Sequence, residues 1–204
     1  MSTASKTSIA SLAALKLGQE PIRSLDDTND TFAKLANNRF DFAAKSVLRT
    51  HEWNSVHKRT LLNPLSDAPD FEFSYQYNLP ADFLSVRRVS NTDNDKIDYE
   101  LEGKKLLCNS SVIRLEYTFF PEDWSIIDPL LADTISAYLA YDLAYNVTRD
   151  SDARNQMFLD YQRMLDNAKR VNGKEGRTRK IRAKTWHTAR FTGNYDYIPD
   201  DQPQ

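Results

Sequence analysis

The residue types that most often carry chemistry are few in this chain and widely spaced. His51 and His57 flank a glutamate in a segment partly like the helix of zinc proteases, and His187 lies far away. Zinc chemistry of that kind needs two histidines four residues apart, because both must lie on one helical face. Here they are six apart, and a change from helix to strand is expected between them. We interpret them as polar residues at the end of a helix.

A nucleophile or an acid–base pair is no better supported. Cys108 is the single cysteine and lies in a strand pattern, where packing is a simpler role than attack. Glu116 could pair with Glu122 or Asp123, but a chain with 29 acidic residues contains such pairs by chance. The five glycines are too scattered for a phosphate-binding loop. We therefore predict no catalytic residue, no cofactor-binding residue and no metal ligand, and a protein that is not an enzyme.

Length, charge and cysteine content limit the remaining classes. The chain has 204 residues, enough for one good core or for two small units that share one. Its net charge of −2 excludes polyanion binding by bulk charge, so an electrostatic partner must meet a local patch. A single cysteine excludes an intramolecular disulfide and fits a reducing cytoplasm. The most apolar segment is residues 126–147. Because it contains three aspartates, it predicts a buried helix and not a membrane span, and we expect no membrane among the partners.

Two helices are expected before residue 54. Apolar residues at helical spacing predict the first over residues 5–17, with Gly18 as its left-handed cap and Pro21 preventing continuation. Asp27 or Thr28 can cap a second helix that runs to about His51. Its apolar stripe recurs every three or four residues and comprises Phe32, Ala36, Phe40, Ala43 and Val47.

The spacing changes from 3.6 to 2 after Trp53, which predicts strands. Phe71, Phe73, Tyr75 and Tyr77 alternate with polar residues, and so do the apolar residues of 113–119. Shorter strands are expected at 83–90, 97–101 and 105–109, with turns at 91–94 and 102–103. Residues 54–120 thus predict a small antiparallel β unit with one aromatic face.

The helical period returns after Pro121. Leu131, Ile135, Leu139 and Leu143 predict a central helix, beside which Tyr138, Tyr141 and Tyr145 form a second stripe. Ser151 can cap a last long helix that Gly173 ends. The predicted fold class is α+β: a bundle of about four helices from residues 1–53 and 121–172, an inserted antiparallel β-sandwich-like unit at 54–120, and an extended C-terminal arm at 173–204.

The arm differs from the rest of the chain in charge. From Gly173 to Arg190 it has seven basic residues and one acid, Glu175, with two aromatic residues nearby. We predict that it binds a partner through Lys174, Arg177, Arg179, Lys180, Arg182, Lys184, Trp186, Arg190 and Phe191. The partner could be an acidic groove on a protein or a nucleic acid. A solvated terminus is the third reading, although aromatic residues favour docking.

Two segments resemble a known family. Residues 13–22 (AALKLGQEPI) form a helix end, a glycine and a proline turn. A tryptophan, a Lys-Arg-Thr-Leu strand at 58–61 and the segment 75–86 (YQYNLPADFLSV) follow. This pattern resembles the tail tubular protein A family, the head-to-tail adaptors of short-tailed bacteriophages, over about residues 8–90. The residues that carry the resemblance, and that we interpret as scaffold, are Gly18, Pro21, Trp53, Tyr77, Leu79, Pro80 and Asp82.

The resemblance implies a function in virion assembly. Members of this family form a twelvefold ring that binds the portal protein, closes the DNA-filled head and provides the platform for the next tail protein, a nozzle or tail tube. Packaged DNA passes through such a ring, which lies at the head–tail junction of the virion and is assembled in the host cytoplasm. The arm would extend along the portal. The alternative is a nucleic-acid-binding accessory protein that acts through its basic arm.

Overall fold

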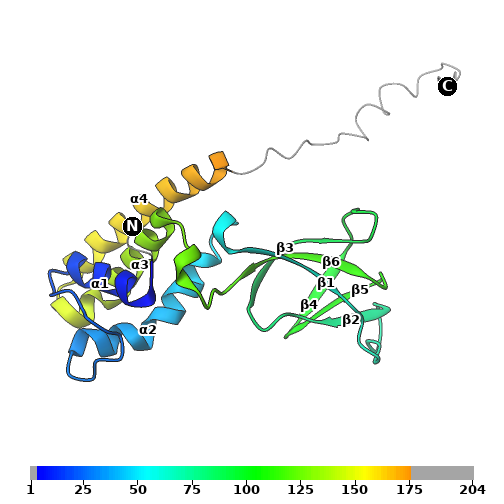
Figure 1. Ribbon diagram of the computed structural model, residues 1–204, viewed down its shortest axis with the longest axis horizontal. Helices are drawn as coiled ribbons and strands as arrows, with labels where there is room; N and C mark the ends of the chain where they lie inside the picture. Colours follow the sequence, from blue (N-terminus) through cyan, green and yellow to red (C-terminus); the bar gives the residue numbers. More distant parts are fainter. Residues whose placement is uncertain (1–3, 176–204) are drawn as a thin grey trace, which may run out of the picture.

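The molecule is elongated, with a bundle of four helices at one end of its long axis and two small antiparallel sheets at the other (Figure 1). The structure is a computed structural model, and it describes residues 4–175. Its α+β class is the one that the sequence predicts. The helices are α1 (Lys6–Lys16), α2 (Thr31–Leu48), α3 (Pro129–Thr148) and α4 (Ser151–Glu175). The strands are β1 (His57–Leu62), β2 (Tyr75–Asn78), β3 (Phe83–Ser90), β4 (Tyr99–Glu102), β5 (Lys105–Cys108) and β6 (Ile113–Phe119).

The first two helices begin at side-chain caps. Ser5 and Ser8 form a reciprocal capping box at the start of α1, and Gly18, with φ +69°, follows its end as predicted. The cap of α2 is Asp30, whose carboxylate accepts from the backbone N–H of Phe32 at 2.8 Å. The prediction of Asp27 or Thr28 as this cap is therefore wrong. Asp27 instead accepts from Asn29 N–H at 2.9 Å and shapes the preceding loop.

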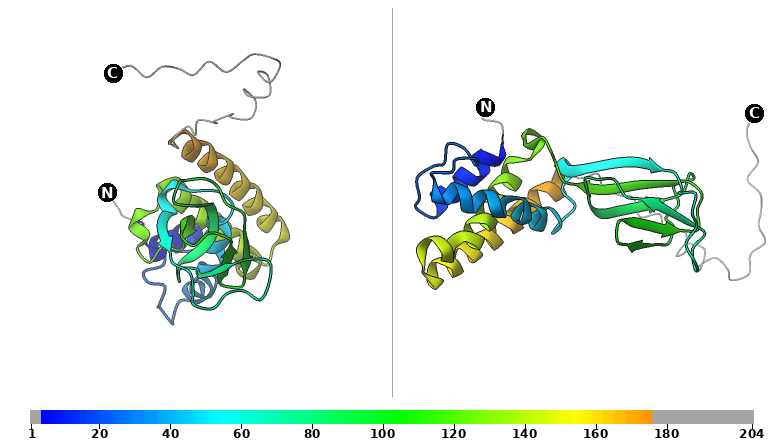
Figure 2. Two further views of the ribbon diagram at one scale, coloured as in Figure 1. Left: turned by 90° about the vertical axis from the view of Figure 1, so that its right-hand side faces the viewer. Right: turned by 90° about the horizontal axis from the view of Figure 1, so that it is seen from below.

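Helix α3 is the centre of the bundle, as its leucine spacing predicts, and contacts the other three helices (Figure 2). Its four predicted core residues, Leu131, Ile135, Leu139 and Leu143, are all buried. Burying each such side chain contributes roughly 1.5–3 kcal/mol to stability. None of the helices within residues 4–175 is long and apolar enough to cross a membrane.

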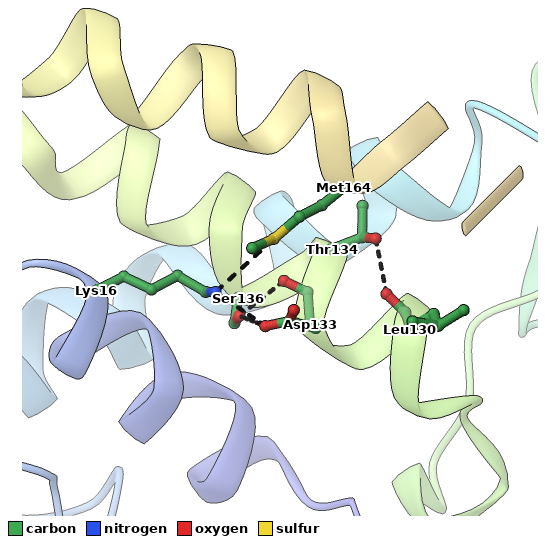
Figure 3. A network of polar contacts seen from close by, with 6 residues as sticks. All are labelled: Lys16, Leu130, Asp133, Thr134, Ser136 and Met164. Carbon is green, nitrogen blue, oxygen red and sulfur yellow. Dashed lines mark hydrogen bonds and ion pairs between the residues drawn. The ribbon is translucent and has the colours of Figure 1, made fainter. Parts of the chain in front are cut away.

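A small polar network joins three of the helices (Figure 3). Lys16 at the end of α1 pairs with Asp133 of α3 at 2.9 Å, and its ammonium lies 3.7 Å from the sulfur of Met164 on α4. Ser136 donates to the Asp133 backbone carbonyl at 2.7 Å, as hydroxyls in helices often do. The lysine stem and the methionine side chain thus fill the space where α1, α3 and α4 meet.

The β unit is a sandwich of two three-stranded sheets, with strand orders β1-β6-β3 and β2-β5-β4. Inward-facing residues of both sheets, such as Leu115 in β6 and Leu106 in β5, are fully buried and share one core with the bundle. A two-residue turn joins β4 to β5, and Gly103 in this turn has φ +58°, which glycine adopts without strain.

Of the alternating aromatic residues from Phe71 to Tyr77, only Tyr75 and Tyr77 lie in a strand. β2 begins at Tyr75, because its partner β5 offers four residues and pairs with Tyr75–Asn78 alone. Before it, Phe73 N–H donates to the Phe71 carbonyl at 2.8 Å around Glu72, which has φ +69°. This tight turn leaves the Phe71 side chain 78% exposed. The prediction of four rings on one strand face is therefore wrong.

The last helix extends further than predicted. α4 continues through Gly173 to Glu175, so Gly173 does not end it and the arm cannot begin there. Its start is held by Asp150, whose carboxylate accepts from Asp152 N–H at 2.8 Å, whereas the predicted cap Ser151 is already helical. Glycine is tolerated here at a cost of about 1 kcal/mol relative to alanine.

Candidate interaction surfaces

The end of α4 is fixed to the segment that joins the bundle to the β unit. The side-chain oxygen of Asn172 accepts from Asn54 N–H at 2.8 Å, and the Asn54 amide donates to the Asn172 carbonyl at 3.0 Å. The Asn172 amide also donates to the Glu52 carbonyl at 3.1 Å and lies 3.0 Å from His51 Nε2. The sequence did not single out Asn172, because a lone asparagine in a helix carries no pattern. The end of α4 therefore lies at this junction.

One residue of the predicted partner-binding arm falls within the described residues. Lys174 lies in the last turn of α4, where a positive charge is favourable to the helix dipole. The remaining residues of that prediction lie outside the described residues: Arg177, Arg179, Lys180, Arg182, Lys184, Trp186, Arg190 and Phe191.

A hollow of about 600 Å³ lies between the end of α4 and the outward face of the sheet β1-β6-β3. In it, His57 Nε2 lies 3.2 Å from a Glu116 carboxylate oxygen, and Arg59 Nε lies 3.8 Å from the same oxygen. Arg87 donates to Thr118 Oγ1 at 2.9 Å and also to the Trp53 carbonyl. The hollow thus brings guanidinium groups near the Glu116 carboxylate, and Glu52 also lines it.

Both histidines of the junction are held toward their neutral form. Burial lowers the pKa of His57, and the positive charges of Arg87 and Arg59 lower it further against the opposing effect of Glu116. Burial also lowers the pKa of His51, with a further contribution from Lys169. A neutral His51 suits its neighbour, since the Asn172 amide can donate to an unprotonated Nε2.

The residues considered for chemistry are not brought together. His51 packs edge-on against Trp53 with ring centroids 5.0 Å apart, whereas His57 faces Glu116. Within residues 4–175, no three His, Cys, Asp or Glu side chains are grouped as metal ligands would be. Cys108 is fully buried, and burial raises the pKa of its thiol.

The carboxylates considered as an acid–base pair are also separated by their roles. Glu116 lines the junction hollow, whereas Glu122 lines a different hollow beside α2 and β3. Asp123 accepts from Ser125 N–H at 2.9 Å, which caps the short helix Trp124–Ile126 and lowers the pKa of its carboxyl.

The motif residues at the start of the β unit act as local braces. The buried Trp53 ring donates from Nε1 to the Val47 carbonyl at 3.2 Å, which closes the end of α2. The Tyr77 hydroxyl donates to the Ser110 carbonyl, and Leu79 N–H donates to the Lys104 carbonyl at 3.0 Å. These bonds hold β2 against its neighbours.

Asp82 is the most connected motif residue. Its carboxylate pairs with Lys58 on β1 and accepts from the Tyr117 hydroxyl on β6 at 3.0 Å, while its backbone carbonyl accepts from Phe120 N–H at 2.8 Å. Just before it, the Pro80 carbonyl accepts from Phe83 N–H at 3.1 Å and forms the turn into β3. Asp82 thereby ties all three strands of one sheet together, close to the bundle.

The outward face of the sheet β1-β6-β3 is rich in arginine. Strand pairing places Arg59 beside Glu116 and Leu61 beside Arg114, all pointing away from the buried Leu115. The register of β3 also places Arg88 across from Glu116. Alternation along residues 57–62 and 113–119 could have predicted this face, because arginine occupies outward positions in both strands.

The outward face of the sheet β2-β5-β4 is acidic. The loop before β2 arches over it and encloses a hollow of about 410 Å³, in which Lys105 donates to the Gln76 side-chain oxygen at 2.9 Å. Phe71 projects from the loop. The acidic residues that line the hollow are Asp67, Asp70, Glu72, Glu100 and Glu102.

The bundle also exposes apolar side chains that its own core does not use. At the end of the α3–α4 pair, Tyr141 packs against Phe158 with ring centroids 5.1 Å apart, and Arg154 lies over the Tyr141 ring. Tyr145, the last residue of the tyrosine stripe on α3, is 50% exposed. Further large apolar residues exposed on the helices are Leu12, Leu15, Phe42 and Leu159.

Comparison with known proteins found no family model and no curated protein that matches this chain. The chemistry of its surfaces therefore rests on the side chains themselves. Guanidinium groups bind carboxylates and phosphates through paired hydrogen bonds, and carboxylates bind lysine and arginine. Exposed aromatic and aliphatic side chains add apolar area to such contacts. The arrangement thus supplies several separate surfaces suited to binding other macromolecules.

Proposed function

We propose that this chain is a structural head-to-tail adaptor of a tailed bacteriophage. Copies of it would form a ring that binds the portal protein, closes the DNA-filled head and carries the next tail protein. The proposal begins from the resemblance over residues 8–90 and draws its main support from one structural relationship. The residues that carry the resemblance, from Trp53 to Asp82, are the ones that brace the β unit where it leaves the bundle.

An adaptor must bind different neighbours with different parts of its surface. The elongated arrangement in Figure 1 separates the helical bundle from the tip of the β unit, so each can meet its own partner. The bundle carries exposed apolar residues such as Phe42 and Leu15. Monomeric proteins also expose single apolar residues, but a molecule with two well-separated ends suits a protein placed between two others.

Portal attachment through the arm is part of this proposal. Because Asn172 fixes the end of α4, the basic residues that follow start from a defined place on each copy. In a ring, many arms would engage one portal at once, and linked contacts of this kind raise avidity without strengthening any single contact. The arm is proposed to meet an acidic groove on the portal.

The test is to mix the purified chain with the portal of the same phage and to examine the mixture by light scattering and electron microscopy. A ring that caps the portal with matching symmetry is the expected result. The matched control is the portal of an unrelated phage, which should remain uncapped. A chain that ignores its portal but binds duplex DNA, with an affinity that falls steeply as salt rises, would support the nucleic-acid-binding alternative instead.

A further inference from the structure

The two outward faces of the β sandwich carry opposite charge. On the sheet β1-β6-β3, four arginines surround a single glutamate. On the other side, five carboxylates of the sheet β2-β5-β4 and of the loop before β2 surround a single lysine. The arginine face comprises Arg59, Arg87, Arg88 and Arg114 with Glu116. The acidic face comprises Asp67, Asp70, Glu72, Glu100 and Glu102 with Lys105. The sandwich is therefore polarised across its thickness.

Each face also carries one exposed apolar side chain among its charges. Leu61, which is 63% exposed, lies on the arginine face directly across from Arg114. Phe71, which is 78% exposed, lies on the loop of the acidic face. An exposed apolar residue within a ring of charged side chains is the usual composition of a contact between proteins, with an apolar centre and a polar rim.

The two faces of one molecule cannot meet, because the core of the sandwich separates them. Stacked sheets lie roughly 10 Å apart, and side chains such as Leu106 and Leu115 fill the space between these two. The acidic face of one copy can, however, meet the arginine face of another. A contact between two different faces of identical molecules is heterologous, and repeated contacts of this kind generate closed rings or open filaments.

We infer that the arginine face of one copy of this chain binds the acidic face of the next. The inference rests on the proposed assembly of copies into a ring, and it identifies which surfaces join them. Complementary charge sets the orientation and partner choice at such contacts more than it sets their affinity. Because the charges lie at the surface, the contact weakens as salt screens them over about 8–10 Å.

Charge reversal on each face provides the test, measured on the full chain by sedimentation at low salt and high protein concentration. The wild type should self-associate, and E100K/E102K and R59E/R114E should each weaken this association at least tenfold. The decisive sample is an equal mixture of the two variants. The first variant keeps its arginine face and the second keeps its acidic face, so the mixture should associate where neither variant does alone. A mixture that stays monomeric overturns the inference.

The matched control for E100K/E102K is E20K/D26K, which makes the same change in charge on exposed residues of the loop between α1 and α2. It should associate as the wild type does, and circular dichroism should show that all three variants are folded. Association that survives both face variants would mean that other surfaces join the copies. Binding of duplex DNA that R59E/R114E abolishes, without self-association of the wild type, would assign the arginine face to nucleic acid and also overturn the inference. No portal is present in these samples, so their outcome is separate from portal binding.

Discussion

Asn172 and Asn54 form two reciprocal hydrogen bonds, of 2.8 and 3.0 Å, between the end of the last helix and the start of the β unit. They join residues that are 118 positions apart in the chain. The chain leaves the bundle after α2, forms both sheets and returns as α3 and α4. The contact therefore ties the end of the bundle to the start of the β unit.

Replacing Asn172 with alanine should weaken this junction. The change removes the side-chain bonds to Asn54 and Glu52, and bonds of this kind contribute about 1–2 kcal/mol in total when partly exposed. We expect a fall in melting temperature of about 3–6 °C. Asn155→Ala, an exposed position on the same helix, is the control and should leave the melting temperature within about 1 °C. Equal melting temperatures for the two variants would show that the junction does not depend on Asn172.

Stability should decrease as the pH falls from 7.5 to 5.5. The pKa values of His51 and His57 are lowered in the folded protein, so the unfolded chain binds more protons below about pH 6.5. The free energy of unfolding then drops by at most about 1.4 kcal/mol per pH unit for each histidine. Urea unfolding at several pH values measures this slope. H51Q and H57Q should each flatten it, and a slope that the double variant leaves unchanged would assign it to other groups.

Removing the Asp82 carboxylate should lower the free energy of unfolding more than removing the Tyr117 hydroxyl, which donates a hydrogen bond to it. Asp82→Ala loses the contacts to both Lys58 and Tyr117, whereas Tyr117→Phe loses one hydrogen bond, so we expect costs of about 2–3 and about 1 kcal/mol. Burial and Asp82 together raise the pKa of Tyr117 to about 12, so the phenol keeps its proton at neutral pH. A double-mutant cycle by urea unfolding isolates the pair. A coupling energy near zero would mean that Asp82 acts through Lys58 alone.

Much of this fold follows from local pattern, and its exceptions have physical causes. The leucine spacing of α3 predicts its buried face, because a helix surrounded by three others must be apolar along its length. Alternation at Phe71 and Phe73 predicts a strand, but strand β5 has no residues to pair with them. Gly173 reads as a helix end, yet Asn172 contacts favour one more turn of α4. In both cases contacts between segments far apart in the sequence set where the element begins or ends. The local sequence does not reveal such contacts.

The surfaces were harder to predict than the core. The sequence drew attention to the basic stretch from Lys174 to Arg190, since seven like charges in a short segment form an obvious pattern. The polarity of the sandwich depends on which strands are neighbours, because Arg59 and Arg114 belong to strands far apart in sequence that pair only in the folded protein. The acidic face likewise combines the loop at residues 67–72 with strand β4.

Truncation at two positions separates the arm from the junction. A chain that ends at Glu175 keeps every contact of Asn172, so it should remain folded with a melting temperature within about 2 °C of the full chain while portal attachment is lost. A chain that ends at Arg170 also loses the junction bonds and should unfold several degrees lower. Thermal unfolding and co-sedimentation with portal measure the two properties on the same samples. If the chain ending at Glu175 attached to portal as well as the full chain, the bundle and β unit would suffice for binding and the arm would have to serve another partner.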